Sequence, residues 1–290
     1  MTVTSTDSGR IVRPTSLEEA IAASTERPDA RILGGGTLVV AERSLGIDIP
    51  PAYLLLSGIA ELRSVTSDGA TATGGAARIG AQTTLRALLD AALSPMLDVA
   101  LRSLATPQIR HRATVGGNIA ERRPAHTLAP CLLALDASVG SAGPEGSRRR
   151  SIRDFVAEGL GAGEILVDVA LPARGGFQRF VRVAPRNGPG YAIASVAVSI
   201  DPTARSVRSG IGGSGPTALP GTAADDFLAG AVDWESGAVP AGAAEEYGRL
   251  LADACDPPTD DRASAGYRRH AIAVMGRRLI EAWNEEQQRG

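Results

Sequence analysis

Apolar and polar positions in the first part of the chain recur at two different spacings. Residues 16–24 have helical spacing, and Ser16 begins a capping-box arrangement. Between residues 84 and 104 leucines recur at threes and fours, and Pro95 interrupts them, which predicts a pair of helices. Short β-like runs occur at residues 31–33, 53–56 and 71–73.

The second part of the chain has the pattern of strands followed by helices. Strands are predicted at residues 165–171, 177–183, 192–200 and 206–211, and helices at 223–228, 243–254 and 263–287. The Pro-Ala-Arg-Gly-Gly stretch at 172–176 favours a domain boundary. We therefore predict an α+β protein with a disordered N-terminus (1–10), a first domain (11–172) and a C-terminal sheet-plus-helices domain (177–290).

Composition and charge narrow the class of protein. Of the 290 residues, 43% are hydrophobic and 21% charged, which supplies a core and does not suggest disorder. The net charge is -2, so the chain has no positive electrostatic field that would attract the phosphate backbone of a nucleic acid. Aromatic residues make up 3%, too few for a surface on which bases stack. All basic residues are arginine, which we attribute to coding bias. We expect no nucleic-acid partner.

Cysteine and histidine positions argue against a metal site or a disulfide framework. Cys131 and Cys255 are far apart in sequence, so any iron–sulfur cluster must belong to another chain. His111, His126 and His270 show no metal-ligand spacing and are interpreted as surface or structural histidines. The polar N-terminus and the absence of a long apolar run predict a cytoplasmic protein without a membrane span.

Two glycine-rich segments carry the candidate chemistry. Gly34-Gly35-Gly36-Thr37 follows a strand-like run, and Thr114-Val115-Gly116-Gly117-Asn118 follows an irregular segment. Glycine permits positive φ and close approach, so consecutive N–H groups of such loops can converge on an anion. Two loops of this kind could hold a diphosphate between them. The alternative is that each is an ordinary tight turn.

A third glycine cluster, residues 210–215, matches G-x-G-x-x-G, but its context argues against a dinucleotide-binding turn. Pro216 and Pro220 follow it where a helix would be needed, and no βαβ unit surrounds it. The sequence also contains neither a G-x-S-x-G elbow nor a P-loop. The run Arg148–Arg150 is interpreted as a solvated loop.

The order of several motifs resembles the FAD-binding subunit of molybdenum hydroxylases, the medium chains of the xanthine dehydrogenase and aerobic carbon monoxide dehydrogenase family. These motifs are Ile32-Leu33-Gly34-Gly35-Gly36-Thr37, Ile79-Gly80-Ala81-Gln82-Thr83-Thr84, Arg110 to Ala120, Pro130 with Leu132 to Asp136, Tyr191 to Ser195 and Tyr267-Arg268-Arg269. The resemblance covers nearly the whole chain. It implies a two-lobed FAD-binding domain of the vanillyl-alcohol-oxidase-like type, followed by a C-terminal domain that covers the flavin.

The resemblance also implies which residues contact FAD. The residues that correspond to the family's diphosphate-binding loops are Gly34, Gly35, Gly36, Thr37, Leu38, Thr114, Val115, Gly116, Gly117 and Asn118. Arg182 takes the place of a basic residue that reaches the flavin, and Tyr191 that of a group beside the isoalloxazine ring. The alternatives are a solvated strand arginine and an ordinary strand tyrosine.

Two departures from the family pattern concern the cofactor. Leu38 stands where the first loop usually has a polar residue, and Thr127 stands where an acid usually binds the sugar portion of the cofactor. A threonine hydroxyl can still bond a sugar hydroxyl, but more weakly than a carboxylate. Arg122 and Arg123 suggest either phosphate contacts or solvated side chains.

The function that the resemblance implies is an FAD-carrying electron-transfer subunit of a multi-subunit dehydrogenase. A molybdenum-cofactor subunit would oxidise the substrate, a [2Fe–2S] subunit would relay electrons, and FAD would pass them to NAD, a quinone or oxygen. Since redox chemistry belongs to the cofactor, no catalytic residue is predicted in this chain. The alternatives are a stand-alone FAD-dependent oxidase or dehydrogenase of specialised metabolism, and a scaffold that has lost FAD.

Overall fold

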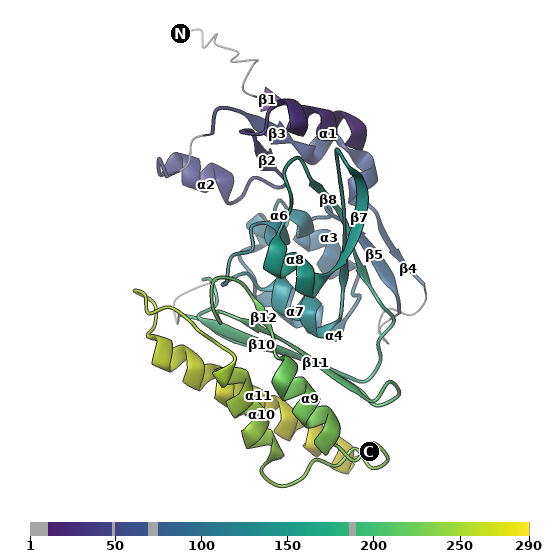
Figure 1. Ribbon diagram of the computed structural model, residues 1–290, viewed down its shortest axis with the longest axis vertical. Helices are drawn as coiled ribbons and strands as arrows, with labels where there is room; N and C mark the ends of the chain where they lie inside the picture. The colour runs from purple at the N-terminus through teal and green to yellow at the C-terminus, as the bar shows by residue number, and fades with distance from the viewer. Residues whose placement is uncertain (1–10, 48–49, 69–74, 186–189, 290) are drawn as a thin grey trace.

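The computed structural model describes residues 11–47, 50–68, 75–185 and 190–289. Its elements form three tiers along the long axis of the molecule (Figure 1), with the N-terminal residues at one end and the C-terminal helices at the other. The expected disordered segment 1–10 and the β-like run at 71–73 lie outside the described residues.

The first tier is a small parallel sheet in the order β1-β3-β2. Its elements are β1 (Ile11–Val12), α1 (Leu17–Glu26), β2 (Arg31–Leu33), α2 (Val39–Ser44) and β3 (Tyr53–Leu55), followed by the 3-10 turns η1 (Leu56–Gly58) and η2 (Ala60–Arg63). Helix α1 begins where predicted, because the Ser16 side chain accepts a hydrogen bond from the Glu19 N–H. Ala20, Leu54 and Ile59 are buried in the core of this tier.

The middle tier is an antiparallel sheet in the order β4-β5-β8-β6-β7. Its strands are β4 (Val65–Ser67), β5 (Ala77–Gly80), β6 (Ser138–Gly143), β7 (Gly146–Ser151) and β8 (Ile165–Leu171), and its helices are α3 (Leu85–Asp90), α4 (Pro95–Ser103), α5 (Pro107–Arg110), α6 (Val115–Ala120), α7 (Leu128–Ala134) and α8 (Ile152–Glu158). The predicted helical pair is α3 and α4, and Pro95 is the first residue of α4.

The run Arg148–Arg150 is part of strand β7, so its interpretation as a solvated loop was wrong. Arg150 is buried, where its guanidinium donates to the carbonyl of Gly159 and pairs with Glu164. Arg148 and Arg149 are exposed, whereas Arg150, near the end of β7, is enclosed by its contacts with Gly159 and Glu164.

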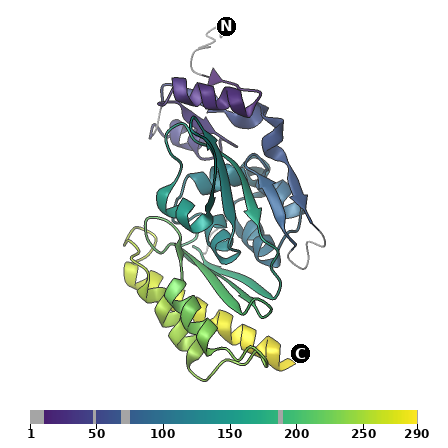
Figure 2. The same ribbon diagram turned by 45° about the vertical axis from the view of Figure 1, so that its right-hand side comes forward.

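The third tier is an antiparallel sheet in the order β12-β11-β10-β9, covered by three helices. Its elements are β9 (Phe177–Val183), β10 (Ala194–Asp201), β11 (Ser206–Gly212), β12 (Leu219–Pro220), α9 (Thr222–Ala231), α10 (Ala243–Asp253) and α11 (Ala265–Arg289). The three helices cover the outer face of this sheet, and the middle tier lies against the other face (Figure 2).

Every residue of β10 is buried, because the two faces of its sheet join different cores. Val196 and Val198 pack with the C-terminal helices, whereas Ala197 and Phe180 belong to the core of the middle tier. Helix α7 lies close against β11: a β-carbon at Gly210 would fall 2.1 Å from the carbonyl oxygen of Pro130. The third glycine cluster therefore serves packing between tiers.

Candidate functional site

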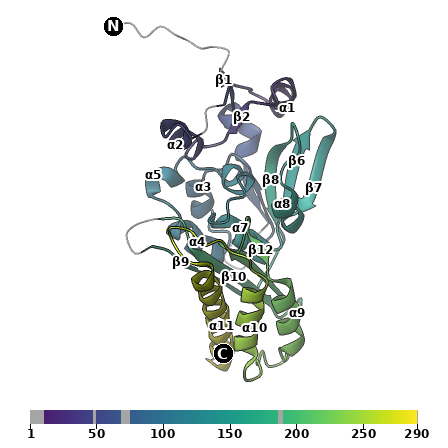
Figure 3. The ribbon, with the colours of Figure 1, turned by 60° about the vertical axis from the view of Figure 1, so that its left-hand side comes forward.

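One cleft brings together most of the residues singled out in the sequence. It has a volume of about 280 Å³ and lies between β2, α2, α6, the segment that precedes α7, and the loop after β9. Helices α2 and α5, which border it, lie on the same side of the molecule (Figure 3). Of the predicted site residues, those that line the cleft are Gly34, Gly35, Gly36, Thr37, Leu38, Thr114, Gly117, Asn118, Thr127, Arg182 and Tyr191. Val115 and Gly116 do not line it; both are buried beneath it.

The first glycine segment is a turn between β2 and α2. Gly36 has φ +71°, a conformation that favours glycine. Gly35 packs so closely on the second segment that a β-carbon there would fall 1.8 Å from the carbonyl oxygen of Arg112. Among the described residues, the N–H groups from Gly34 to Thr37 have no hydrogen-bond acceptor. These donors therefore remain available to an anion.

The second glycine segment is the first turn of a helix, so the expectation of a loop was wrong. Thr114 caps α6, and its side chain accepts a hydrogen bond from the Gly117 N–H. The N–H groups of Val115 and Gly116 donate to the carbonyls of Thr83 and Ala81. Neither Gly116 nor Gly117 has a positive φ. The N–H groups of this segment are thus used within the protein, and they do not form an anion-binding nest.

The two glycine segments nevertheless lie in contact. A β-carbon at Gly34 would fall 2.5 Å from the Thr114 hydroxyl and 3.7 Å from the Gly117 Cα. A ligand held by the first segment would therefore also lie beside Gly117. The described part of the structure therefore has one cleft with free N–H donors on the wall formed by the first glycine segment, and not two equivalent anion-binding loops.

The wall beyond Gly117 carries polar atoms that have no partner among the described residues. The Asn118 Oδ1 is buried and receives no hydrogen bond. Thr127 is 2% exposed, and no bond of its hydroxyl is found within the same part of the chain. A buried oxygen such as the Asn118 Oδ1 is normally paired in a folded protein, so it indicates a site that a polar ligand completes.

His126 is a cleft residue that the sequence reasoning missed. The residue is 8% exposed, its Nδ1 lies 2.6 Å from the Asn118 carbonyl oxygen, and its ring stacks on Tyr191 with ring centroids 6.0 Å apart. Burial lowers its pKa, and the Asn118 carbonyl opposes that shift only in part. The only signal in the sequence was its position beside Thr127, because its contact with Tyr191 joins residues that are distant in sequence.

The charged residues after α6 hold the walls of the cleft together. Glu121 pairs with Arg31 of β2 at 2.8 Å, and Arg123 pairs with Glu42 of α2. Arg122 donates to the carbonyls of residues 156–158 at the end of α8. The Arg122 side chain is bound to protein carbonyls, so it is not free in solvent. The Arg123 side chain is 44% exposed although it pairs with Glu42, which agrees with the prediction of a solvated arginine.

The C-terminal domain supplies the remaining wall through β9 and the residues that precede β10. Arg182 donates to the Gly190 carbonyl at 3.0 Å, and its partial burial lowers the pKa of its guanidinium. Tyr191 is 46% exposed and lies between the His126 ring and the guanidinium of Arg262. Arg268 secures the same segment, because it bonds both the Ile193 carbonyl and Asp260.

The described part of the chain offers no other site with evident chemistry. It contains no group of three or more metal-ligating side chains. Cys131 and Cys255 are free and buried, and burial raises the pKa of both thiols, that of Cys255 to about 12. No helix within the described ranges has the length and apolar content to cross a membrane. The cleft can bind and orient an anionic ligand, but it lacks a paired general acid and base.

Two protein families match successive parts of the chain. Residues 6–174 match the family described as "FAD binding domain in molybdopterin dehydrogenase". Residues 179–283 match "CO dehydrogenase flavoprotein C-terminal domain". The chain is 29% identical to the carbon monoxide dehydrogenase medium chain of Afipia carboxidovorans, and the match covers 93% of this chain and 94% of the relative. It is also 29% identical to the nicotine 6-hydroxylase medium subunit of Paenarthrobacter nicotinovorans, over 93% and 95%.

Solved structures agree with these matches. The chain resembles one in the reconstituted CO dehydrogenase from Oligotropha carboxidovorans, with TM-score 0.82, 27% identity, and coverage of 95% of this chain and 97% of the other. A chain of quinoline 2-oxidoreductase from Pseudomonas putida 86 has the same fold, with TM-score 0.79, 24% identity, and coverage of 96% and 97%. The predicted α+β class, a two-lobed first domain followed by a sheet with helices, is confirmed.

Proposed function

The chain belongs to the family of FAD-binding domains of molybdopterin dehydrogenases, and from this premise we propose that it carries electrons between a partner chain and an external acceptor. Its cofactor is FAD, and it is a subunit of an oxidoreductase. The observation that supports the proposal best is the cleft that the glycine turn, α6 and the C-terminal domain line together.

The residues present fit FAD on two observations. The N–H groups from Gly34 to Thr37 have no acceptor among the described residues, so they suit the diphosphate. The buried Asn118 Oδ1 lacks a donor, so it suits a hydroxyl or N–H group of the cofactor. We propose that Thr114, Thr127, Arg182 and Tyr191 complete the lining of the site, and that Val115 and Gly116 shape it from beneath.

The work of this chain is to bind, orient and shield the cofactor. When bound, FAD supplies the redox chemistry, because it accepts and donates electrons at its flavin ring. The Arg31–Glu121 and Arg123–Glu42 pairs fix the cleft walls, and the stack of His126 on Tyr191 covers its C-terminal side. Electron transfer through FAD needs no acid–base pair of this chain.

We propose two partners, a molybdenum-cofactor subunit and a [2Fe–2S] subunit. Relatives of this length include chains named medium chain or medium subunit and one named as a subunit of a dehydrogenase complex, which supports membership of a larger complex. With only two cysteines, this chain cannot hold a cluster with four cysteine ligands. Any such cluster must therefore belong to another chain, which would pass electrons to FAD, and the acceptor would be NAD, a quinone or oxygen.

The test begins with the cofactor and ends with the complex. The protein is purified alone and after co-expression with the chains encoded beside it, and the flavin released by denaturation is identified as FAD or FMN. We expect non-covalent FAD, and reduction of this FAD when the complex receives its substrate. A protein that never holds or takes up flavin would support the scaffold alternative. Flavin that is reduced by a substrate without any partner would support the stand-alone oxidase.

A further inference from the structure

The His126 ring has one nitrogen paired and one unpaired. Its Nδ1 lies 2.6 Å from the Asn118 carbonyl oxygen. A carbonyl oxygen only accepts hydrogen bonds, so Nδ1 carries the hydrogen and, in the neutral ring, Nε2 carries a lone pair. No partner of Nε2 is found among the described residues, and the ring lines the cleft.

The surroundings of His126 keep its ring neutral near pH 7. Burial is the largest cause and lowers the pKa of the ring below its usual value. Arg123 lowers this pKa further, while Glu121 and the Asn118 carbonyl raise it. The ring also stacks on Tyr191, whose own ring is contacted by the Arg262 guanidinium. The free nitrogen is therefore an acceptor and not a cation.

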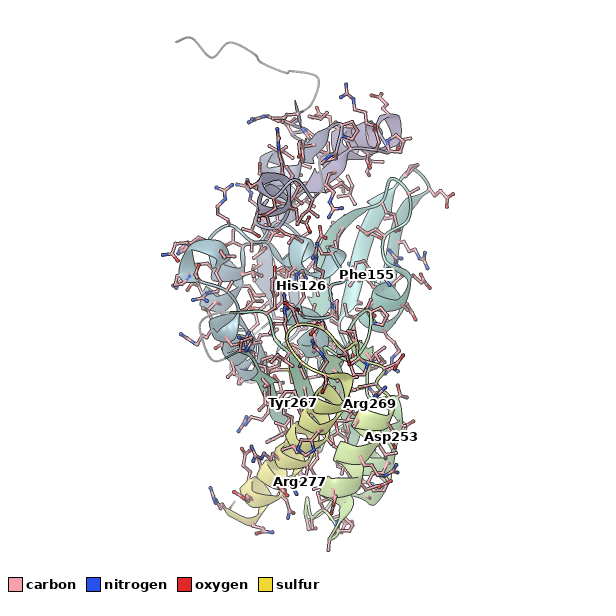
Figure 4. All side chains as sticks on the ribbon, turned by 90° about the vertical axis from the view of Figure 1, so that its left-hand side faces the viewer. His126, Phe155, Asp253, Tyr267, Arg269 and Arg277 are labelled. Atoms are coloured by element: carbon pink, nitrogen blue, oxygen red, sulfur yellow. The ribbon has the colours of Figure 1, made fainter. Side chains whose placement is uncertain are left out.

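The ring is also held in one orientation. The Asn118 carbonyl fixes its Nδ1 edge, and the Tyr191 ring lies along its face with 24° between the planes. Figure 4 shows His126 near the junction of the middle tier with the C-terminal tier. A side chain fixed before the ligand arrives loses little entropy on binding, so its hydrogen bond contributes fully to affinity.

We propose that His126 is a cofactor-binding residue whose Nε2 accepts a hydrogen bond from a hydroxyl or N–H group of FAD. The inference rests on the proposed function. A diphosphate at neutral pH has no hydrogen to donate, so the neutral ring serves the sugar or ring portions of FAD. The acceptor stands beside Thr127, whose short hydroxyl is a weaker acceptor than a carboxylate.

Two substitutions test the roles of the two ring nitrogens separately. His126→Asn keeps an N–H group near Nδ1 and removes the acceptor at Nε2, whereas His126→Gln extends an amide to the Nε2 position. We expect His126→Asn to weaken FAD binding about five- to tenfold, the loss of one buried hydrogen bond, and His126→Gln to stay within about threefold. His126→Phe keeps a ring against Tyr191, and we expect it to lose as much affinity as His126→Asn.

The control is His111→Asn, an exposed histidine outside the cleft, which should bind as the parent does. Circular dichroism and thermal unfolding show whether each variant is folded. FMN and ADP, titrated separately, show which part of FAD donates the hydrogen bond. If the variants lose affinity for FMN alone, the donor lies in the flavin or the ribityl chain; if they lose affinity for ADP alone, it lies in the adenosine.

Acidity gives an independent readout. Protonation places a hydrogen on Nε2, so FAD affinity of the parent should fall on acidification relative to that of His126→Gln. Parent-like affinity in folded His126→Asn or His126→Phe would overturn the inference, as would affinity that rises on acidification through His126. A parent protein that binds no FAD, alone or in its complex, would instead contradict the proposed function.

Discussion

Gly35 lies directly against the main chain of Arg112, so that a β-carbon at position 35 would fall 1.8 Å from the Arg112 carbonyl oxygen. This contact joins the first glycine segment to the residues that lead into α6. Gly117 differs, because a β-carbon there would meet only the Thr114 hydroxyl, at 3.0 Å. Both glycines were expected to lie in loops that contact FAD, but Gly35 packs against main-chain atoms whereas Gly117 packs against one side-chain hydroxyl.

Gly35→Ala should damage the fold itself. The new methyl group would overlap main-chain atoms, which cannot move as a flexible side chain does, and the strain should destabilise the protein by about 1–3 kcal/mol. Chemical unfolding followed by circular dichroism measures the change. An unchanged unfolding midpoint in Gly35→Ala would show that the two segments are less closely packed than described.

Gly117→Ala should change the cleft and spare the fold. Alanine is favoured over glycine within a helix by up to about 1 kcal/mol, so stability should be equal or higher. The added methyl group lies on the cleft wall, and we expect FAD affinity to fall about tenfold. Fluorescence titration with FAD measures the effect, with Gly230→Ala, a glycine with open space around it, as the control. Equal affinity in both variants would place FAD away from α6.

Thr114→Ala should destabilise α6 by about 1 kcal/mol, the usual cost of losing a capping side chain. The Thr114 hydroxyl accepts a hydrogen bond from the Gly117 N–H at 3.1 Å, and an alanine side chain has no atom that can accept it. Thr114→Ser retains the hydroxyl and should lose much less stability. Thermal unfolding of the two variants compares them, and equal losses would mean that the methyl group matters more than the cap.

Thr127→Val should weaken FAD binding, and Thr127→Asp should keep or strengthen it. Valine removes a hydroxyl from a position that lines the cleft, at a cost of about 1 kcal/mol, or less than tenfold in affinity. A carboxylate makes the stronger, charge-assisted bond to a hydroxyl. Titration of FAD into the parent and both variants tests this, and three equal dissociation constants would remove Thr127 from the proposed site.

Asp225 should make the stability of the protein depend on pH. It is 3% exposed, accepts hydrogen bonds from Ser209 and Tyr247, and burial raises its pKa to about 6. Between about pH 4 and pH 6 the folded state holds a proton that the unfolded state has released. Stability should therefore fall as pH rises through this range, by about 3 kcal/mol for this group.

Asp225→Asn, which resembles the protonated acid, should remove that part of the pH dependence. Asp226→Asn changes the exposed neighbouring carboxylate and serves as the control. Urea unfolding of the three proteins from pH 4 to pH 7 gives the comparison. Parallel curves for the parent and Asp225→Asn would mean that Asp225 is ionised throughout this range.

The sequence predicted the elements that local signals specify. Ser16, Pro95 and the leucines of α3 and α4 act within one or two helical turns, so their pattern was sufficient. Helix α6 was missed because its two glycines disfavour a helix; Val115 and Ile119, buried in the middle core, stabilise it through contacts distant in sequence. The position of His126 depends on Tyr191, which belongs to the other domain.

The close fit of Gly210 against Pro130 bears on how relatives of this protein can be recombined. A chimera joined within residues 172–176 would take α7 from one parent and β11 from the other. Where the second parent has a side chain at position 210, the helix and the sheet would collide. Where the first parent has smaller side chains on α7, Ala197 of β10 would lose part of its cover. Although the segment 172–176 resembles a simple linker, the exchangeable unit must include α7 together with the third sheet.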